Sequence, residues 1–263
     1  MNRLPLFSLR QVSFGYLSDQ PFLQNLSLDI YPAESLVILG ANGCGKSTVM
    51  KLVSGLIHPS GGMINAFNLE LSEANLQDEQ FARGFRQRVG FVFQNSDAQL
   101  FSATVWDELA FGPLQLGYSP EQVKQRVQET LALLDIESLA ARPPYRLSGG
   151  EKKKVALACV LAVNPEVLIL DEPTNGLDPR TQRWLVELLL SLRQAGKTLI
   201  TATHDLNIVE EIADRVVIFG EDHRVAADGA PEQLLRNRGL LLDVNLIHEH
   251  SHFHLAGKRA HAH

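Results

Sequence analysis

Eight consecutive residues, Gly40-Ala41-Asn42-Gly43-Cys44-Gly45-Lys46-Ser47, fit the pattern G-x-x-x-x-G-K-[ST] of a phosphate-binding loop. The glycines let the backbone curl so that N–H groups point at phosphate oxygens, and the start of the following helix adds about half a positive charge. We expect Lys46 to contact the β and γ phosphates of a nucleotide, Ser47 to ligate Mg²⁺, and Thr48 to contact the α phosphate. A glycine-rich turn with a chance lysine is the alternative, which the flanking strand and helix signals disfavour.

A second pattern ends the apolar run at 167–170, where Asp171 and Glu172 follow directly. Carboxylates at the carboxyl end of a buried strand lie where open α/β sheets bind ligands. Together with a phosphate loop, Asp171 is expected to hold Mg²⁺. Glu172 is expected to orient the water that attacks the γ phosphate, or to accept its proton. Taken alone, such a pair would more often be a helix cap or a turn.

A third pattern is Leu147-Ser148-Gly149-Gly150-Glu151. Ser148 and Glu151 have the S-x-x-E spacing of a capping box at the start of a helix. The two glycines also expose bare backbone N–H groups at that helix start, which is the chemistry of an anion site. Such a site needs a phosphate that is held elsewhere.

Strand and helix signals alternate along most of the chain, which predicts a mostly parallel sheet. Alternating residues at 6–14 and 26–30 instead predict antiparallel strands with one exposed face. The polar residues 70–88 are interpreted as a connection. Buried strands are expected at 35–40, 89–93, 167–170, 198–203 and 216–219, a short strand at 63–67, and helices from Ser47 to about Gly55, after Ser119-Pro120, over 149–163 and after Asp178-Pro179.

The order of these motifs over residues 6–230 resembles that of the ATP-binding-cassette (ABC) ATPases. The LSGGE segment is similar to the family signature, with Glu151 where Gln is commonest. Gln94 resembles the Q-loop glutamine, a Mg²⁺ and water ligand, and His204 resembles the switch histidine that contacts the γ phosphate. The resemblance implies that both act with Glu172 in catalysis. The segment 175–178, which ends in Asp178, resembles the D-loop.

The resemblance also implies how ATP is bound. Tyr16 looks like the aromatic residue that stacks on adenine; Phe14 is the competing choice, and an ordinary strand-end aromatic is the alternative for Tyr16. The family forms a head-to-tail dimer, so each ATP would be held by the phosphate loop of one subunit and by residues 148–150 of the other. Hydrolysis of ATP would then release the dimer interface, so that the reaction drives a conformational change.

The implied fold is α/β: a P-loop NTPase core with a mostly parallel sheet, an antiparallel β-subdomain and an inserted α-helical subdomain. The expected boundaries are a nucleotide-binding core with the β-subdomain at 1–94, a helical signature subdomain at 95–157, the continuation of the core at 158–230 and a His-rich tail at 231–263.

The composition excludes other classes of protein. Hydrophobic residues make up 45% and charged residues 21%, as in globular proteins, and the net charge of −6 makes nucleic acid a poor partner. No apolar stretch approaches the roughly 18 residues of a membrane helix, and the first residues lack the features of a signal peptide. Cys44 and Cys159 cannot form a disulfide framework.

Residues 95–113 are similar to the ATPase subunits of energy-coupling-factor importers for cobalt and nickel, in which this segment forms a short extra helix near the groove for the transmembrane coupling helix. The similarity implies as partners a transmembrane coupling subunit, a substrate-binding membrane subunit, and a homodimer or heterodimer of ATPases. It also implies a peripheral location on the cytoplasmic face of the bacterial inner membrane. The alternatives are a soluble non-transport ABC ATPase, for example in iron–sulfur assembly, and a nucleotide-gated metal store, which predicts loss of Glu172 or His204.

The last 16 residues carry six of the nine histidines. His248, His250, His252 and His254 are spaced two apart, so an extended chain could wrap them around a transition metal, and neutral imidazole suits Ni²⁺ or Co²⁺. The alternatives are a solvated tail and a purification tag, the second of which the mixed sequence disfavours. The expected ligands are therefore ATP and Mg²⁺, with Ni²⁺ or Co²⁺ as the hypothesis for the tail.

Overall fold

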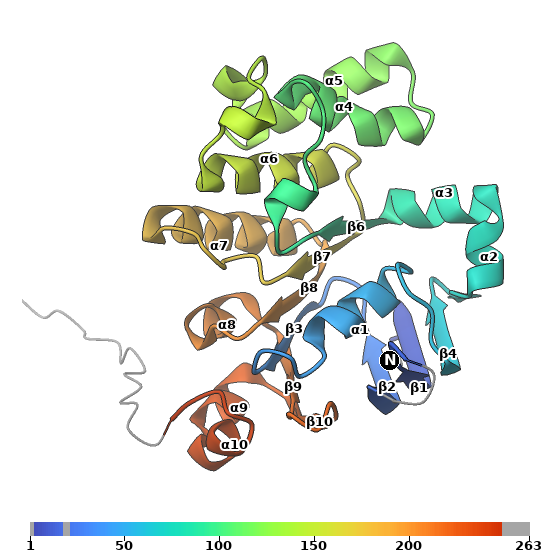
Figure 1. Ribbon diagram of the computed structural model, residues 1–263, viewed down its shortest axis with the longest axis vertical. Helices are drawn as coiled ribbons and strands as arrows, with labels where there is room; N and C mark the ends of the chain where they lie inside the picture. Colours follow the sequence, from blue (N-terminus) through green and yellow to red (C-terminus); the bar gives the residue numbers. More distant parts are fainter. Residues whose placement is uncertain (1–2, 18–21, 249–263) are drawn as a thin grey trace, which may run out of the picture.

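A central six-stranded sheet holds the phosphate loop in the computed structural model, which describes residues 3–17 and 22–248 (Figure 1). Its strand order is β10-β9-β3-β8-β7-β6, and every neighbouring pair is parallel except β10 with β9. The strands are β3 (Ser35–Gly40), β6 (Val89–Val92), β7 (Val167–Asp171), β8 (Thr198–Thr203), β9 (Arg215–Phe219) and β10 (Val225–Gly229). Because parallel strands end at one edge of a sheet, the residues after β3, β6, β7 and β8 lie on the same side.

A second sheet is antiparallel and has the order β2-β1-β4-β5. Its strands are β1 (Phe7–Phe14), β2 (Leu23–Ile30), β4 (Gly61–Ala66) and β5 (Leu69–Glu70). The side chains of β2 alternate between buried and more exposed positions over Leu26–Ile30, as the sequence predicts. This sheet is the expected antiparallel β part of the fold.

Strand β3 separates two hydrophobic cores. Leu36 and Ile38 pack into the core shared with α1 (Lys46–Val53) and the antiparallel sheet. Val37 and Leu39 point into the other core, which includes residues of α6 (Gly149–Leu161) and α7 (Pro179–Gln194). Both faces of β3 are therefore covered, which explains its continuous apolar run.

A block of helices is inserted between β6 and β7. It contains α4 (Val105–Gln115), α5 (Pro120–Leu133) and α6, with short 3₁₀ segments η1 (Ser96–Ala98), η2 (Glu137–Leu139) and η3 (Pro144–Arg146). The capping box predicted at Ser119 is present, and the apolar face of α5 is buried through Val123, Val127 and Leu131. Figure 1 shows α4 and α5 stacked on α6 at the top of the view, at the end of the molecule opposite α9 and α10 (residues 231–243).

Residues 70–88, interpreted from the sequence as a connection, contain two helices that were not predicted. These are α2 (Glu73–Gln77) and α3 (Glu79–Arg88), which begin at the side-chain caps Ser72 and Asp78. Only Ala82 and Phe85 of α3 are buried, so the apolar face is too narrow to dominate a charged sequence. The serine and aspartate caps were the available signal for these helices.

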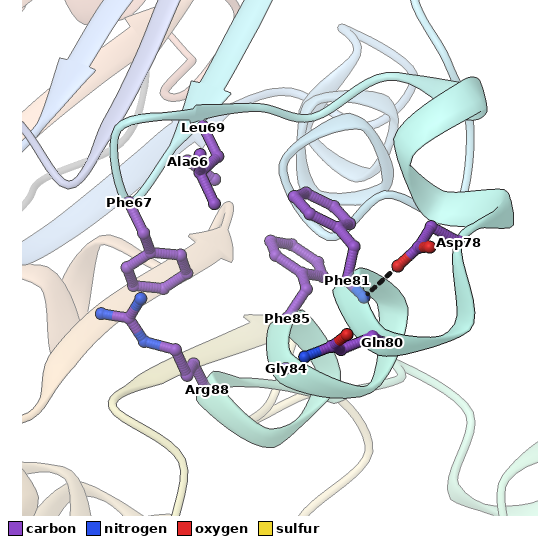
Figure 2. Close-up of a pocket in the computed structure, with 9 residues that line it drawn as sticks. All are labelled: Ala66, Phe67, Leu69, Asp78, Gln80, Phe81, Gly84, Phe85 and Arg88. Carbon is purple, nitrogen blue, oxygen red and sulfur yellow. Dashed lines mark hydrogen bonds between the residues drawn. The ribbon is translucent and has the colours of Figure 1, made fainter.

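An aromatic cavity of about 400 Å³ lies between α3 and the β4–β5 turn (Figure 2). Phe67, Phe81 and Phe85 line it, and the Arg88 guanidinium lies 3.5 Å from the centroid of the Phe67 ring. None of the predicted site residues lines this cavity, so it is separate from the phosphate loop.

Residues 231–243 also differ from expectation, because they fold as helices instead of starting a tail. They form α9 (Pro231–Arg236) and α10 (Arg238–Asp243), and Leu235 and Leu241 are buried against the core. Helix α8 (Leu206–Ile212) lies beside α9. Helices α9 and α10 have six residues each, which is too short for a helical periodicity to stand out in the sequence. Among the described residues, no helix has the length and apolarity to cross a membrane.

Candidate functional site

The loop after β3 has the backbone shape that phosphate binding requires. Gly43 and Gly45 have φ values of 85° and 112°, in the left-handed region that favours glycine. At Gly40 an added Cβ would lie 2.5 Å from Cys44 Sγ and 2.9 Å from the Phe219 carbonyl oxygen, so no larger residue fits. Gly45 caps α1 without a side-chain hydrogen bond, which leaves the N-terminal N–H groups of α1 to bind an anion.

Lys46 is the buried cation of this loop, with 5% of its surface exposed. Its Nζ donates to the carbonyl oxygens of Gly40 and Ala41 at 2.8 and 3.1 Å. The same Nζ lies 3.2 Å from Oε1 of Glu172. The sequence predicted Lys46 and Glu172 as site residues from segments more than 100 positions apart, and the sheet brings them into contact.

Ser47 and Asp171, the predicted Mg²⁺ ligands, lie in contact with each other. Ser47 Oγ donates to Asp171 Oδ1 at 2.9 Å, from the start of α1 to the end of β7. Burial raises the pKa of Asp171, and the hydrogen bond from Ser47 opposes that shift. A hydroxyl and a carboxylate at this distance are the hard oxygen ligands that Mg²⁺ prefers, so the residues present fit this ion.

Glu172 lies between two partners. Its Oε2 is 2.9 Å from Nδ1 of His204, which follows β8, while Oε1 faces Lys46. Oε1 makes no hydrogen bond of good geometry, so its contact with Lys46 is ionic. Glu172 has a φ of 45° and is 5% exposed, and its backbone N–H donates to the Ala202 carbonyl oxygen at 2.9 Å. The strained backbone turns this carboxylate towards the phosphate loop.

Tyr16 lies beside the phosphate loop. Its hydroxyl is 2.9 Å from Thr48 Oγ1, and 58% of its surface is exposed. Phe14 packs edge-on against the Tyr16 ring with centroids 5.0 Å apart, and Phe22 does so at 5.5 Å. Tyr16 therefore presents the more accessible ring for a base, supported from behind by Phe14.

The signature turn, Ser148–Gly150, starts α6. Ser148 and Glu151 form the capping box: the Ser148 N–H donates to Glu151 Oε2 at 2.8 Å, and the Glu151 N–H donates to Ser148 Oγ at 3.4 Å. The Ser148 N–H and the Ser148 hydroxyl both donate to Glu151 Oε2, and these two hydrogen bonds lower the pKa of Glu151. An added Cβ at Gly149 would meet no atom within 4 Å, so the turn is open on that side.

Asp178 is the side-chain cap of α7 and lies close to the signature turn. It accepts from the N–H groups of Arg180 and Thr181 and from Thr181 Oγ1. These bonds, led by the one from the Thr181 hydroxyl, lower the pKa of Asp178. An added Cβ at Gly150 would come within 3.0 Å of Thr181 Oγ1, so the signature turn and the start of α7 touch.

The contacts divide the predicted residues into two groups. Lys46, Glu172 and His204 are joined by contacts, and Ser47 is joined to Asp171. These two sets form one cluster because their members are neighbours in the chain. Within the part of the chain that the structure describes, no hydrogen bond or ion pair joins Gln94 or the signature turn to this cluster. His250, His252 and His254 lie outside the described residues.

Sequence reasoning missed two residues that touch the Q-loop. Lys153 Nζ donates to the Gln94 carbonyl oxygen at 3.1 Å, and Gln99 accepts from the Phe93 N–H. In the sequence, Lys153 is only the middle residue of a run of three lysines, so nothing distinguishes it from its two neighbours.

This fold and site define a P-loop ATPase with an inserted helical block. The family model described as ABC transporter matches residues 23–175. The nickel import ATP-binding protein NikO of Rhodobacter capsulatus is 48% identical over 92% of this chain and 96% of its own length. The chain belongs to the ABC transporter family, and it is an ATPase.

Two solved structures have the same fold. CbiO1 from Clostridium perfringens, described as part of the ABC transporter complex cbiONQ, has a TM-score of 0.78 and 35% identity over 92% of this chain and 95% of its own. The dimeric ATP-binding cassette MJ0796 in a post-hydrolysis state with ADP and Pi has a TM-score of 0.77 and 28% identity over 86% and 98%. These findings give no support to the alternative of a soluble ABC ATPase.

Proposed function

We propose that this chain is the ATP-hydrolysing subunit of a membrane importer, and that Glu172 is its catalytic base. The observation that carries the assignment is the position of the Glu172 carboxylate, which is buried between Lys46 and His204 and next to the Ser47–Asp171 pair. This is the arrangement of a carboxylate that acts on a water molecule beside a phosphate.

Each residue of the cluster has one proposed task. Lys46 and the N–H groups of residues 40–48 bind the β and γ phosphates. Ser47 and Asp171, with Gln94, hold Mg²⁺, which when bound neutralises phosphate charge. Glu172 Oε2 accepts the proton of the attacking water, and His204 orients that carboxylate and contacts the γ phosphate. Tyr16 stacks on the adenine ring.

The signature turn completes the site of a second subunit. Residues 148–150 present open N–H groups at a helix start, which bind anions, and no contact joins them to the phosphate loop among the described residues. A head-to-tail dimer supplies the phosphate they need, with Asp178 at the same interface. The dimeric form of MJ0796 supports this proposal.

Nickel or cobalt is the proposed cargo. The name of NikO, a nickel import ATP-binding protein, and the description of cbiO1 as part of an ABC transporter complex support this proposal. The similarity of the 95–113 segment to importer ATPases also supports it, and we propose that η1 is the short extra helix of that group. The proposed partners are a transmembrane coupling subunit and a substrate-binding membrane subunit, at the cytoplasmic face of the cell membrane. The tail histidines are proposed to bind Ni²⁺ or Co²⁺.

The test is metal uptake by cells. The chain is expressed with the membrane subunits that co-purify with it, and accumulation of Ni²⁺ and of Co²⁺ is measured with wild-type chain, with Glu172→Gln and with Glu187→Gln. Glu187 is an exposed glutamate of α7 and serves as the matched control. Uptake that requires Glu172 but not Glu187 supports the proposal, whereas uptake that is equal in all three strains contradicts it.

A further inference from the structure

Lys153 is a lysine buried inside the helical block, with 2% of its surface exposed. It lies one turn into α6 from the signature turn. Its Nζ donates to the carbonyl oxygens of Gln94 at 3.1 Å and Phe93 at 3.4 Å. A buried ammonium is costly to desolvate, so a lysine here must gain something that an apolar side chain would not provide.

Gln99 makes a second link between the same two segments. Its Nε2 donates to the Ala156 carbonyl oxygen in α6 at 3.0 Å, while its Oε1 accepts from the Phe93 N–H at 3.2 Å. At the surface, Lys152 Nζ lies 2.6 Å from Asp97 Oδ1. The whole segment 93–99, which contains Gln94 and η1, is therefore attached to α6 at several points.

Helix α6 packs directly against strand β6 of the central sheet. An added Cβ at Gly90 in β6 would come within 2.2 Å of Val160 Cγ1, so the helix and the strand approach as closely as glycine allows. In Figure 1, α6 lies between the α4–α5 pair and the sheet, with the signature turn at its N-terminal end. A tether from α6 to residue 94 thus connects the signature turn to the Q-loop through one rigid helix.

We propose that Lys153 is a positioning residue that fixes the Q-loop backbone at Gln94 to α6, the helix that begins at the signature turn. The ammonium attaches to two successive carbonyl oxygens, so it sets the direction in which the Gln94 side chain leaves the backbone. Any displacement of α6, such as one caused by a partner at the signature turn, is then transmitted to Gln94. The inference rests on the proposed role of Gln94 in the Mg²⁺ site.

The ammonium of a lysine suits a position between the carbonyl oxygens of Phe93 and Gln94. An ammonium offers three donors around one point, which matches two adjacent carbonyl oxygens. Burial lowers the pKa of Lys153, and the negative charge of Asp171 opposes that shift.

A double-mutant cycle in the full chain tests the proposal. ATP turnover and ATP affinity are measured for Lys153→Met, Gln94→Ala and the double variant. We expect Lys153→Met to lower kcat about tenfold and to change ATP affinity by less than about twofold, because the phosphate loop is untouched. In the Gln94→Ala background the same substitution should cost less than about twofold, because Lys153 acts through Gln94.

Two further variants separate positioning from folding. Lys154→Met removes the next lysine of α6, whose Nζ lies 4.6 Å from the Trp184 ring, and should leave turnover within about twofold of wild type. Lys153→Arg retains a donor and should restore part of the loss. If thermal unfolding shows that Lys153→Met does not fold, Gln99→Ala replaces it in the same cycle, because it removes the second tether.

The outcomes distinguish this inference from the proposed function. An equal loss from Lys153→Met in both backgrounds, or no loss in either, overturns the positioning role. Wild-type turnover of Gln94→Ala overturns the role of Gln94 and the inference together. A large loss in Gln94→Ala with no effect of Lys153→Met overturns the inference alone and leaves the Mg²⁺ assignment of Gln94 standing.

Discussion

Glu172 contacts His204 through one carboxylate oxygen, at 2.9 Å from Nδ1, and Lys46 through the other, at 3.2 Å from Nζ. One buried carboxylate is thus held between His204, which follows β8, and Lys46 of the phosphate loop. The two contacts fix the rotation of the carboxylate. A proton acceptor held in this way is ready to act on a water molecule without first rearranging.

Replacing Glu172 by Gln should stop turnover but leave ATP bound. The amide keeps the shape of the side chain but is not basic enough to accept a proton, so we expect kcat to fall at least about 100-fold. ATP should then hold a long-lived dimer, visible by light scattering with Mg·ATP. Glu187→Gln on the surface of α7 is the control. Normal turnover of Glu172→Gln would remove this residue from the catalytic role.

The sequence predicted the parts of this site that depend on local pattern. The phosphate loop, the apolar strand before it and the carboxylates at the end of β7 are each a continuous segment of fewer than about ten residues, so each can be recognised from the local sequence. The helices within 70–88 and 231–243 were not predicted, because they are short and each buries at most two residues. Lys153 was missed because its burial depends on packing between segments about 60 residues apart.

Replacing Lys46 by Ala should abolish tight nucleotide binding. The variant loses charge-assisted contacts to phosphate, each of which contributes about 1.5–3 kcal/mol, so ATP should bind at least about tenfold more weakly. Equilibrium binding of a fluorescent ATP analogue measures the change. Lys124→Ala on the exposed side of α5 is the control. Unchanged affinity in Lys46→Ala would contradict the phosphate-loop assignment.

The raised pKa of Asp171 predicts how stability depends on pH. Burial disfavours the ionised form in the folded chain, so the folded state takes up this proton at a higher pH than the unfolded state does. Ionisation of Asp171 therefore lowers the free energy of unfolding as pH rises from the ordinary value of 3.8 through the raised pKa. The neutral variant Asp171→Asn should be more stable than wild type at neutral pH without Mg²⁺.

Urea unfolding at a series of pH values without Mg²⁺ measures this difference. The advantage of Asp171→Asn should shrink as pH falls through the pKa of Asp171, because the wild-type carboxyl becomes neutral as well. With Mg²⁺ present, wild type should recover stability and the variant should not. An advantage that grows on acidification would mean that the pKa is lowered, and would contradict the burial argument.

The tail histidines should bind transition metals independently of the folded chain. Replacing His250, His252 and His254 by Ala should remove most of the Ni²⁺ retained in equilibrium dialysis, because imidazoles two apart can share one ion. His261→Ala with His263→Ala removes two other tail histidines and should retain most of the metal. Thermal unfolding without metal should be the same for both variants. Equal metal retention by the two would contradict a site at 250–254.

Gly149 offers the sharpest test of the signature turn, because an added Cβ there meets no atom of its own chain within 4 Å. Gly149→Ala should therefore fold normally, and alanine favours a helix over glycine. If the turn closes on the ATP of a partner subunit, the methyl group should nevertheless obstruct the phosphate and lower turnover at least about tenfold. In the Glu172→Gln background it should also prevent the ATP-dependent dimer. Gly84→Ala in α3 is the matched control, because its Cβ also meets open space. Wild-type turnover and dimer formation in Gly149→Ala would show that residues 148–150 do not approach a nucleotide.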